Sequence, residues 1–395
     1  MIDQILLYTA AVPMSRSFRH AGAARTATET VLLRVDAGGA TGWGEGAPRS
    51  YVTGESAGSA AANLAAVPVQ RLDELTDWSS PEAMVRALGG LDLAALVGRG
   101  QPAPSAAAAL ETALLDAAAR LHDRSLTEVF RAEFGGRRRW PQSWPVTLVI
   151  DLDQDVRKVL EQLPQTTLDA LEHVKLKVDA DAEDGVARVR AAAELLGPGC
   201  TVSADANCAW PQEQATQLGA ALTAAGAAWI EEPTAPRAWW TLRSLAAARV
   251  PVMLDESLLT ARDLGLAARI GAATHVNLRI SKCGGPLAVA RLAAQARDAG
   301  LAFQLGVQVG EVGPLWAAGR ALAAALEGPV AVEAGRQDEW FPEPLTEPAY
   351  TIDRVGYRAA PPIGPGTGVS PSAELLAHCK PYARWSPQDR WQEVS

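Results

Sequence analysis

The sequence predicts an α/β fold in which a TIM-type barrel of seven or eight βα units follows a separate α+β domain. Residues 143–335 alternate short β-branched runs with Ala- and Leu-rich stretches at helical spacing, and this alternation is typical of βα repeats around a parallel sheet. Residues 1–142 lack that alternation and indicate paired strands followed by helices. Ionisable residues also end several successive predicted strands, and catalytic groups of a barrel gather at such ends.

Eight strands are expected in the barrel region, with helices between them. The strands lie at residues 144–150, 173–178, 200–204, 228–231, 250–254, 275–280, 302–307 and 330–333. The helices include residues 184–196, 212–225, 261–270, 286–299 and 314–326. Several of these helices end at a glycine, a residue that commonly caps helix ends. Eight strand signals with intervening helices indicate a closed barrel.

The chain is expected to divide into a capping domain at 1–142, a barrel at 143–340 and a C-terminal segment at 341–395. Residues 29–36 alternate like a strand, 36–39 form a turn, and 42–45 begin a pairing strand. A helix is expected at 105–121, with Ser105 capping its first turn. A stretch rich in proline and glycine at 359–368 leads into the tail, which is expected to return to the first domain.

Composition limits the classes of partner. The formal net charge is −9 and the basic residues are dispersed except for Arg137, Arg138 and Arg139, so no nucleic-acid partner is expected. No apolar run is long enough to span a bilayer, so no membrane partner is expected. The four cysteines show no CxxC or zinc-site spacing. Together with an N-terminus unlike a signal peptide, this indicates a cytoplasmic protein.

Five successive predicted strands end in ionisable side chains, each about one βα unit of roughly 30 residues from the next. These side chains are Lys175 with Lys177, Asp205, Glu231, Asp255 and Lys282. A lone Asp at a strand end is more simply a helix N-cap. Three carboxylates in register on adjacent strands are hard to explain as caps, and they form a hard oxygen site that suits Mg²⁺ or Mn²⁺.

The lysines indicate acid–base chemistry. Lys175 and Lys177 are two apart on a strand and therefore share a face, where a nearby ammonium lowers its neighbour's pKa from about 10.4. A lowered pKa makes lysine a usable base. The alternative, an exposed edge strand, does not suit a closed barrel. Lys282 alone would be a solvated loop lysine, but its expected position opposite the pair favours a functional role.

These motifs together resemble the enolase superfamily, and within it the muconate-lactonizing subgroup. The KxK of Lys175 and Lys177, the DxN at 205–207, the EEP at 231–233, the DES at 255–257 and the KxGG that ends at Gly285 match that family's motifs in order and spacing. The GWGEGAP run at 42–48 is similar to its capping domain. The resemblance implies two mobile loops, here about 13–28 and 48–54, that close over the barrel mouth. It also implies a homo-oligomer.

The resemblance further implies a mechanism. Asp205, Glu231 and Asp255 would hold Mg²⁺, with Mn²⁺ as the alternative by the same donor chemistry, and the ion would bind the substrate carboxylate and neutralise the enediolate formed when the α-proton leaves. Lys177, with Lys175 beside it, would be the base on one face. Lys282 would be the acid on the other face, or would stabilise the intermediate of an elimination or cycloisomerisation.

Two lysines on opposite faces favour a racemase or epimerase of an amino-acid derivative, because one can remove the proton and the other can return it. A cycloisomerase or syn-dehydratase that uses the same residues is the alternative. A non-catalytic binding barrel is the least favoured hypothesis. The expected partner is a small-molecule carboxylate.

The sequence also offers candidates for substrate contact. They are Asn207, Glu256, Gln308, Glu311, Glu333, His20 and Tyr51. For Glu311 and Glu333, a helix cap or a structural salt bridge is an equal alternative, and Arg49 is more simply an interdomain contact. Dipeptide epimerases of the subgroup carry an Asp-x-Asp at the eighth strand, and residues 332–335 lack it.

Overall fold

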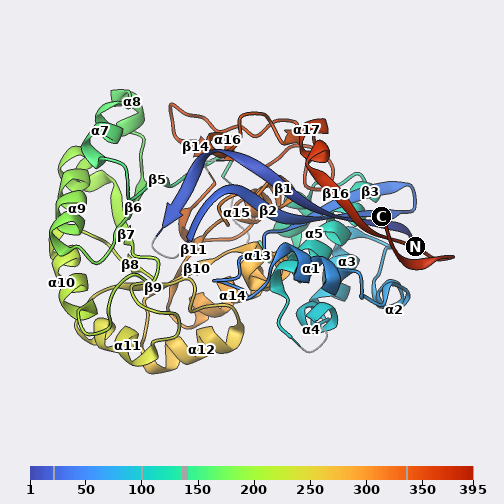
Figure 1. Cartoon of the computed structure of the whole chain (residues 1–395), viewed down its shortest axis with the longest axis horizontal. Helices are drawn as coiled ribbons and strands as arrows, with labels where there is room; N and C mark the ends of the chain where they lie inside the picture. Colours follow the sequence, from blue (N-terminus) through green and yellow to red (C-terminus); the bar gives the residue numbers. More distant parts are fainter. Residues whose placement is uncertain (21–22, 99–100, 136–140, 335–336, 395) are drawn as a thin grey trace.

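Eight parallel strands form the central sheet of the computed structural model (Figure 1). The structure describes residues 1–20, 23–98, 101–135, 141–334 and 337–394, without the side chains of 18–20 and 23–24. The strands are adjacent in chain order: β5 (Leu148–Ile150), β6 (His173–Lys177), β7 (Thr201–Asp205), β8 (Ile230–Glu231), β9 (Val252–Leu254), β10 (His275–Leu278), β11 (Ala302–Leu305) and β12 (Pro329–Val332). A 2.9 Å hydrogen bond from the Thr147 amide to the Val332 carbonyl joins the two edges of the sheet into a barrel. All eight predicted strands are confirmed.

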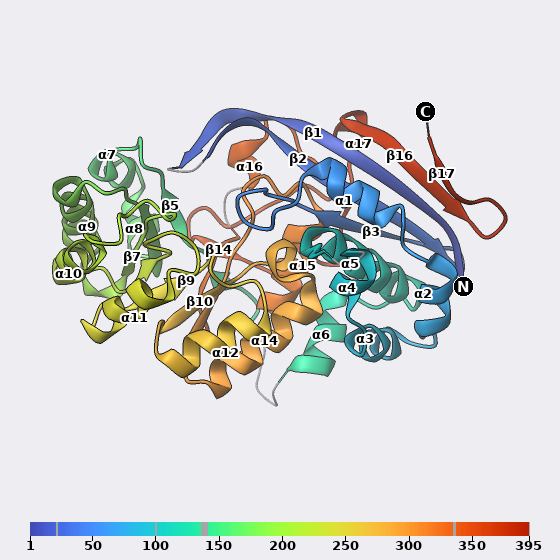
Figure 2. The ribbon, with the colours of Figure 1, turned by 60° about the horizontal axis from the view of Figure 1, so that its bottom comes forward.

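Helices cover the outside of the barrel, with α9 to α12 as a continuous outer layer in Figures 1 and 2. The helices that accompany the barrel strands along the chain are α7 (Val156–Glu161), α8 (Gln165–Leu168), α9 (Ala182–Leu196), α10 (Ala215–Ala225), α11 (Trp239–Ala247), α12 (Ala261–Ile270), α13 (Ile280–Cys283), α14 (Pro286–Asp298), α15 (Pro314–Ala323) and α16 (Gln337–Trp340). Thr260 caps α12 in a capping box with Asp263, and Gly271 ends it in the left-handed conformation. The five predicted helices are confirmed.

The capping domain is built on a five-stranded antiparallel sheet in the order β17-β16-β1-β2-β3. Its strands are β1 (Ile2–His20), β2 (Ala23–Ala37), β3 (Ala40–Gly46), β16 (Cys379–Ser386) and β17 (Arg390–Glu393). The C-terminal tail therefore returns to the first domain as predicted, because β16 pairs with β1. The far end of the β1–β2 hairpin reaches over the barrel towards β5 (Figures 1 and 2). The domain boundaries at 142 and 340 stay predictions.

Helices α1 (Ala57–Leu64), α2 (Val69–Leu75), α3 (Pro81–Gly89), α4 (Leu93–Gly98), α5 (Pro104–Leu121) and α6 (Leu126–Phe134) complete the capping domain, with α17 (Ala373–Ala377) before β16. Short pairs join β13 (Thr346–Glu347) to β15 (Ser370–Pro371) and β4 (Trp144–Pro145) to β14 (Arg358–Ala359). Gly42, Gly44 and Gly46 alternate along β3, and a Cβ atom at any of them would collide with a backbone oxygen of α5. The GWGEG run therefore lets strand and helix pack backbone to backbone.

The predicted role of Ser105 as a helix cap is wrong. Helix α5 begins at Pro104, so Ser105 lies inside its first turn. The Glu55 carboxylate instead accepts hydrogen bonds from the Ser105 amide at 2.9 Å and the Ala106 amide at 3.2 Å. A side chain fifty residues earlier in the chain thus satisfies the amides at this helix end.

Carboxylates of the capping domain also satisfy the first amides of barrel helices. Glu45 accepts from the amides of Val312 at 2.7 Å and Gly313 at 3.0 Å, just before α15. Glu111 accepts from the Leu287 amide at 2.7 Å, in the first turn of α14. Both carboxylates are buried, and burial raises the pKa of each to about 7. Hydrogen bonds from amides of the barrel to carboxylates of the capping domain therefore join the two domains, in addition to apolar packing.

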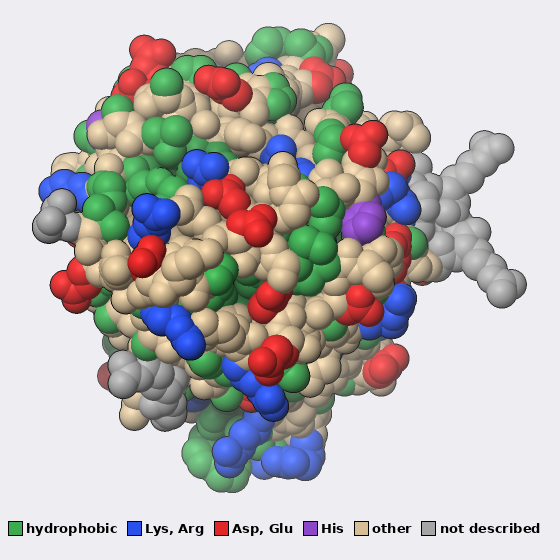
Figure 3. All heavy atoms as spheres, turned by 90° about the vertical axis from the view of Figure 1, so that its right-hand side faces the viewer, with side chains coloured by type: hydrophobic (Ala, Val, Ile, Leu, Met, Phe, Trp, Pro, Cys, Tyr) green, Lys and Arg blue, Asp and Glu red, His purple; other side chains and the backbone are tan. Residues whose placement is uncertain are grey.

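Two surface properties bear on the expected partners. Among the described residues, no helix has both the length and the apolar character needed to cross a bilayer. Figure 3 shows the capping-domain end of the molecule, where basic and acidic side chains are interspersed between apolar ones. The residues Arg137 to Arg139 lie outside the described part of the chain.

Replacing Glu111 by Gln tests whether burial raises the pKa of this carboxylate in the folded protein. Its folded-state pKa of about 7 lies above the ordinary 4.5, so between pH 5 and 7 the folded protein binds about one more proton at this site than the unfolded chain. The contribution of Glu111 to stability therefore falls as pH rises through this window, and Glu111→Gln should remove up to about 1.4 kcal/mol per pH unit from the slope of stability against pH. Urea unfolding at pH 5, 6 and 7 measures the slope, with exposed Glu183→Gln as the control; equal slopes in wild type and Glu111→Gln would contradict the expectation.

Candidate active site

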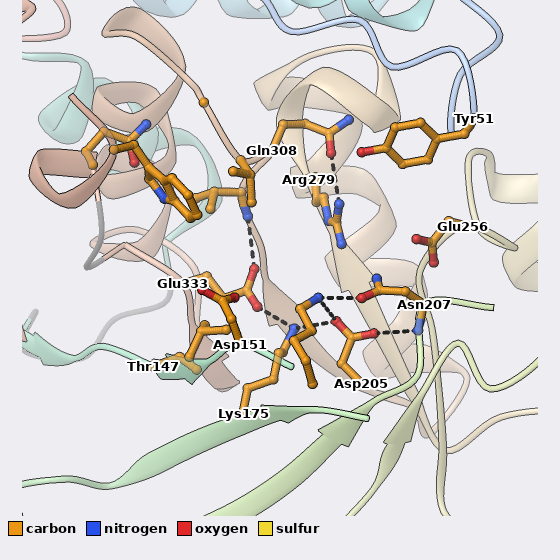
Figure 4. Close-up of a pocket in the computed structure, with 17 residues that line it drawn as sticks. Tyr51, Thr147, Asp151, Lys175, Asp205, Asn207, Glu256, Arg279, Gln308 and Glu333 are labelled. Atoms are coloured by element: carbon orange, nitrogen blue, oxygen red, sulfur yellow. Dashed lines mark hydrogen bonds and ion pairs between the residues drawn. The ribbon is translucent and has the colours of Figure 1, made fainter. Parts of the chain in front are cut away.

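A pocket opens at the carboxyl ends of the barrel strands, beneath the capping domain (Figure 4). Lys175 and Lys177 line it from β6, Asp205 from β7, and Arg279 from the residue after β10, while Tyr51 contributes from the capping domain. The pocket lies where a parallel barrel is expected to place its functional groups.

The two lysines of β6 have different surroundings. The Lys177 ammonium is 2.6 Å from Asp205 Oδ2 and 2.7 Å from Asn207 Oδ1, and its side chain is 13% exposed. Lys175 is buried, with its Nζ 2.5 Å from Glu231 Oε2 and paired with Glu333. Burial alone would lower the pKa of Lys175, but the charges of Glu231, Glu333 and Asp205 together raise it above its ordinary value. The prediction of a lowered pKa is therefore wrong for Lys175.

The three predicted metal ligands lie at the ends of neighbouring strands, and each one is paired with a cation of the chain. Asp205 accepts from Lys177 and Glu231 pairs with Lys175, as above, while Asp255 Oδ1 accepts from Lys282 at 2.7 Å. Within the described ranges, no three His, Cys, Asp or Glu side chains are arranged so that they could hold a metal ion. The Lys175 ammonium lies near two of these carboxylates, 2.5 Å from Glu231 Oε2 and 3.8 Å from Asp205 Oδ2.

The chemistry of this donor set nevertheless fits a divalent cation. Asp205, Glu231 and Asp255 supply the hard oxygen atoms that Mg²⁺ and Mn²⁺ prefer. Beside them, Glu256 is buried, and its Oε2 has no hydrogen-bond partner among the described residues. Burial and the charges of Glu232 and Asp205 raise the pKa of Glu256 to about 8. A divalent ion would balance this concentration of buried negative charge.

Arg279, and not Lys282 as predicted, faces the pocket from the wall opposite Lys175 and Lys177. Strands β6 and β10 are second and sixth in the order of eight and so lie across the barrel from each other. Arg279 lines the pocket, pairs with Asp255, and donates to Gln308 Oε1 at 2.8 Å. The two-residue period of a strand places Asn277 and Arg279 on one face, a signal that could have identified Arg279.

Lys282 lies in α13 and is fully buried. Burial lowers its pKa to about 8, which by itself would suit a base. Its Nζ, however, is within 2.8 Å of three acceptors, the Asp255 carbonyl, Asp255 Oδ1 and the Asn277 carbonyl. Lys282 thus donates all three protons inside the protein and does not line the pocket, so its catalytic role stays a prediction and its position supports a structural one.

Five of the predicted substrate-contact residues line the pocket, although their contact with a substrate stays a prediction. These are Asn207, Glu256, Gln308, Glu333 and Tyr51. Glu311 does not line it, because its Oε1 accepts from the Gln308 amide at 2.8 Å. This contact is neither the helix cap nor the salt bridge that was the alternative for Glu311. His20 ends β1, and its side chain lies outside the described residues.

Arg49 makes the interdomain contact that was the simpler expectation for it. Its side chain is buried and donates to the Val309 carbonyl at 2.7 Å. From β2, Thr28 donates to the next carbonyl, that of Gly310, at 2.9 Å. The capping domain thus holds the loop that follows β11.

The rim of the pocket contains a further contact between the domains. Arg16 lies at a bulge where β1 loses its register with β2. Its Nη2 is 3.4 Å from both Asp151 Oδ2 and Glu339 Oε2, and its guanidinium carbon is 4.6 Å from the centroid of the Trp340 ring. Asp151 and Trp340 line the pocket. Because these contacts join distant parts of the chain, a single sequence carries no signal for them.

Comparison with known proteins identifies the family. The model for the enolase C-terminal domain-like family matches residues 157–375, more than half of the chain, and the model for the mandelate racemase / muconate lactonizing enzyme N-terminal domain matches residues 4–130. The chain belongs to the mandelate racemase / muconate lactonizing enzyme family. The resemblance to the enolase superfamily, and the barrel with its capping domain, are thereby confirmed.

Known members of this family that resemble the chain are isomerases of more than one kind. It is 31% identical to an N-succinylamino acid racemase of Amycolatopsis over 68% of this chain and 69% of that protein. It is also 31% identical to a muconate cycloisomerase of Rhodococcus opacus over 74% of this chain and 75% of that protein. A dipeptide epimerase of Enterococcus faecalis, solved with Mg and a dipeptide, shares the fold with a TM-score of 0.77 at 19% identity, covering 93% of this chain and 99% of that one. The chain is therefore an enzyme of the enolase superfamily.

Replacing Lys282 by Met should destabilise the fold, because it leaves part of the buried Asp255 charge without its partner. Breaking a buried pair in this way costs about 3–5 kcal/mol. Urea unfolding measures the loss, and Lys158→Met, at an exposed position of α7, should stay within about 0.5 kcal/mol of wild type. A Lys282→Met protein as stable as wild type but without activity would instead restore Lys282 as a catalytic group.

Proposed function

We propose that this enzyme removes a proton from the carbon next to the carboxylate of a small-molecule substrate, with Lys177 as the base. The observation that carries the proposal is the position of the Lys177 ammonium, which lines the pocket and is held by Asp205 and Asn207. Lys175, charged through its ion pairs with Glu231 and Glu333, would stabilise negative charge on the substrate from the same wall.

Asp205, Glu231 and Asp255 are the residues that would hold a magnesium or manganese ion. When bound, such an ion polarises a substrate carboxylate and offsets the charge that develops as the α-proton leaves. The chain itself orients these carboxylates: Asn277 Nδ2 donates to Glu231 at 2.7 Å, and the Asn207 amide donates to Asp205 at 3.0 Å. Such supporting hydrogen bonds fix the orientation of the Glu231 and Asp205 carboxylates.

The position of Arg279 favours chemistry on one side of the substrate. A guanidinium stays protonated in proteins, so Arg279 can stabilise negative charge but cannot take up and return a proton. A racemase needs a proton carrier on each side of the reacting carbon, whereas a cycloisomerase or a syn-dehydratase can use one lysine for both proton transfers. We therefore favour a cycloisomerase or a syn-dehydratase.

A racemase or epimerase of an amino-acid derivative is the second candidate. What supports it is the 31% identity to the Amycolatopsis N-succinylamino acid racemase, which is matched by the 31% identity to a muconate cycloisomerase. The two relatives thus support both kinds of reaction equally. The guanidinium of Arg279 opposite Lys177 is what supports our preference for the one-sided reaction.

Exchange of an α-proton with solvent tests the role of Lys177. Proton NMR in deuterium oxide with Mg²⁺, over a panel of N-acyl amino acids, dipeptides, hydroxy acids and unsaturated diacids, should show exchange or conversion of at least one compound. Lys177→Ala should slow that reaction by about 100-fold or more. Lys158→Ala, on the surface of α7, should react like wild type. Equal rates in wild type and Lys177→Ala would refute the proposal.

The variant Arg279→Lys tests the one-sided mechanism. It places a second lysine opposite Lys177. The variant should therefore exchange the α-proton of both enantiomers of a chiral substrate, whereas the wild type should act on only one of them. Chiral chromatography combined with NMR detects the new enantiomer. If the wild type already interconverts the enantiomers, the reaction is a racemisation and the one-sided mechanism is wrong.

A further inference from the structure

We infer that Gln308 donates a hydrogen bond to a neutral carbonyl oxygen of the substrate, and so selects carboxylates that carry a second carbonyl group of the amide type. The inference rests on the proposed function and adds to it the residue that reads this part of the substrate. It starts from the Gln308 side chain, which lines the pocket, is 2% exposed, and has an Nε2 without a hydrogen-bond partner among the described residues.

The orientation of the Gln308 amide follows from its neighbour. Arg279 has donors and no acceptor, and its Nη1 is 2.8 Å from Gln308 Oε1. The oxygen must therefore face Arg279, which turns the NH₂ group the other way, towards the side of the pocket where Tyr51 lies (Figure 4). A buried NH₂ group without an acceptor costs stability, so a substrate oxygen at this point would supply the missing partner.

The backbone of Gln308 is also held in place. Its amide donates to Glu311 at 2.8 Å, and the two carbonyls that follow it accept from Arg49 and Thr28 of the capping domain. A donor held on both sides in this way reads a substrate atom with little loss of conformational freedom on binding. Gln308 is therefore a specificity-determining residue whose position depends on both domains.

The charges around Gln308 indicate that the acceptor is neutral. The charge of Arg279 is already offset by its ion pair with Asp255. The other cations of the pocket are offset in the same way, because Lys175 pairs with Glu231 and Glu333 and Lys177 pairs with Asp205. A second carboxylate of the substrate would therefore find no uncompensated cation beside Gln308, whereas an amide carbonyl accepts the hydrogen bond without needing one.

Binding of matched ligands tests the inference. Isothermal titration in Mg²⁺ buffer compares a panel of N-acetyl-L-amino acids with the N-thioacetyl counterpart of the tightest binder, whose sulfur is a weak acceptor. Gln308→Leu should lower the affinity for the N-acetyl ligand by about three- to tenfold, as expected for the loss of one hydrogen bond. Its affinity for the N-thioacetyl ligand should stay unchanged. Gln308→Glu, which keeps the shape and the Arg279 contact but presents an acceptor, should weaken the N-acetyl ligand at least as much.

Gln304→Leu is the matched control. Gln304 is a buried glutamine of β11 whose side-chain amide also lacks partners among the described residues, but it does not line the pocket. Its replacement should leave the affinity for both ligands unchanged.

Two results would overturn the inference. One is an equal loss for N-acetyl and N-thioacetyl ligands in both Gln308 variants, which would make Gln308 a structural residue. The other is the finding that N-acetyl amino acids bind with no higher affinity than the free amino acids. Either result leaves the proposed function standing if Lys177-dependent proton exchange is observed with some carboxylate. If proton exchange does not depend on Lys177, the proposed function itself is refuted.

Discussion

The barrel mouth depends on neutralising carboxylates that have been removed from water. Asp205, Glu231 and Asp255 are at most 1% exposed, and an isolated charge at such a depth would cost several kcal/mol. Four cations form ion pairs with these carboxylates: Lys175, Lys177, Lys282 and Arg279. Asn277 and a nearby backbone amide donate further hydrogen bonds to them. The same cations that make the site chemically capable therefore also allow it to fold. This dual role explains why a cation at the mouth cannot be assigned to catalysis from its presence alone.

Much of this organisation could be predicted from residue patterns, because strand and helix periods and turn residues are local properties. The eight strands, the outer helices and the carboxylates at the ends of β7, β8 and β9 follow from such patterns. The error at Lys282 has a local cause: the strand ends at Leu278 and α13 begins at Ile280, so the chain turns away from the pocket before Lys282 is reached. The raised pKa of Lys175 depends on Glu231 and Glu333, which come from other strands. The contacts of Arg16 likewise join distant segments and could not be foreseen.

The capping domain does more than cover the barrel. Through Glu45 and Glu111 it completes the first turns of α15 and α14, and Ser281 in turn accepts from the Ala47 amide at 2.9 Å. Through Thr28 and Arg49 it fixes the loop after β11. The pocket is consequently shaped by residues from both domains. The ionisable groups lie on the barrel strands, whereas the loop that carries Gln308 is held in place by the capping domain. A change in the capping domain can then alter selectivity while the barrel groups stay as they are.

The pairing of β16 with β1 has a consequence for how the protein is made. During synthesis, β1 to β3 emerge before the barrel, and β1 then forms an edge of the capping sheet, with unpaired backbone groups along its outer side. Its partner β16 leaves the ribosome after the whole barrel. Exposed edges are templates for association with other chains. The nascent protein must therefore protect this edge while the barrel is translated, and β16, which is made after the barrel, completes a sheet that began to form before it.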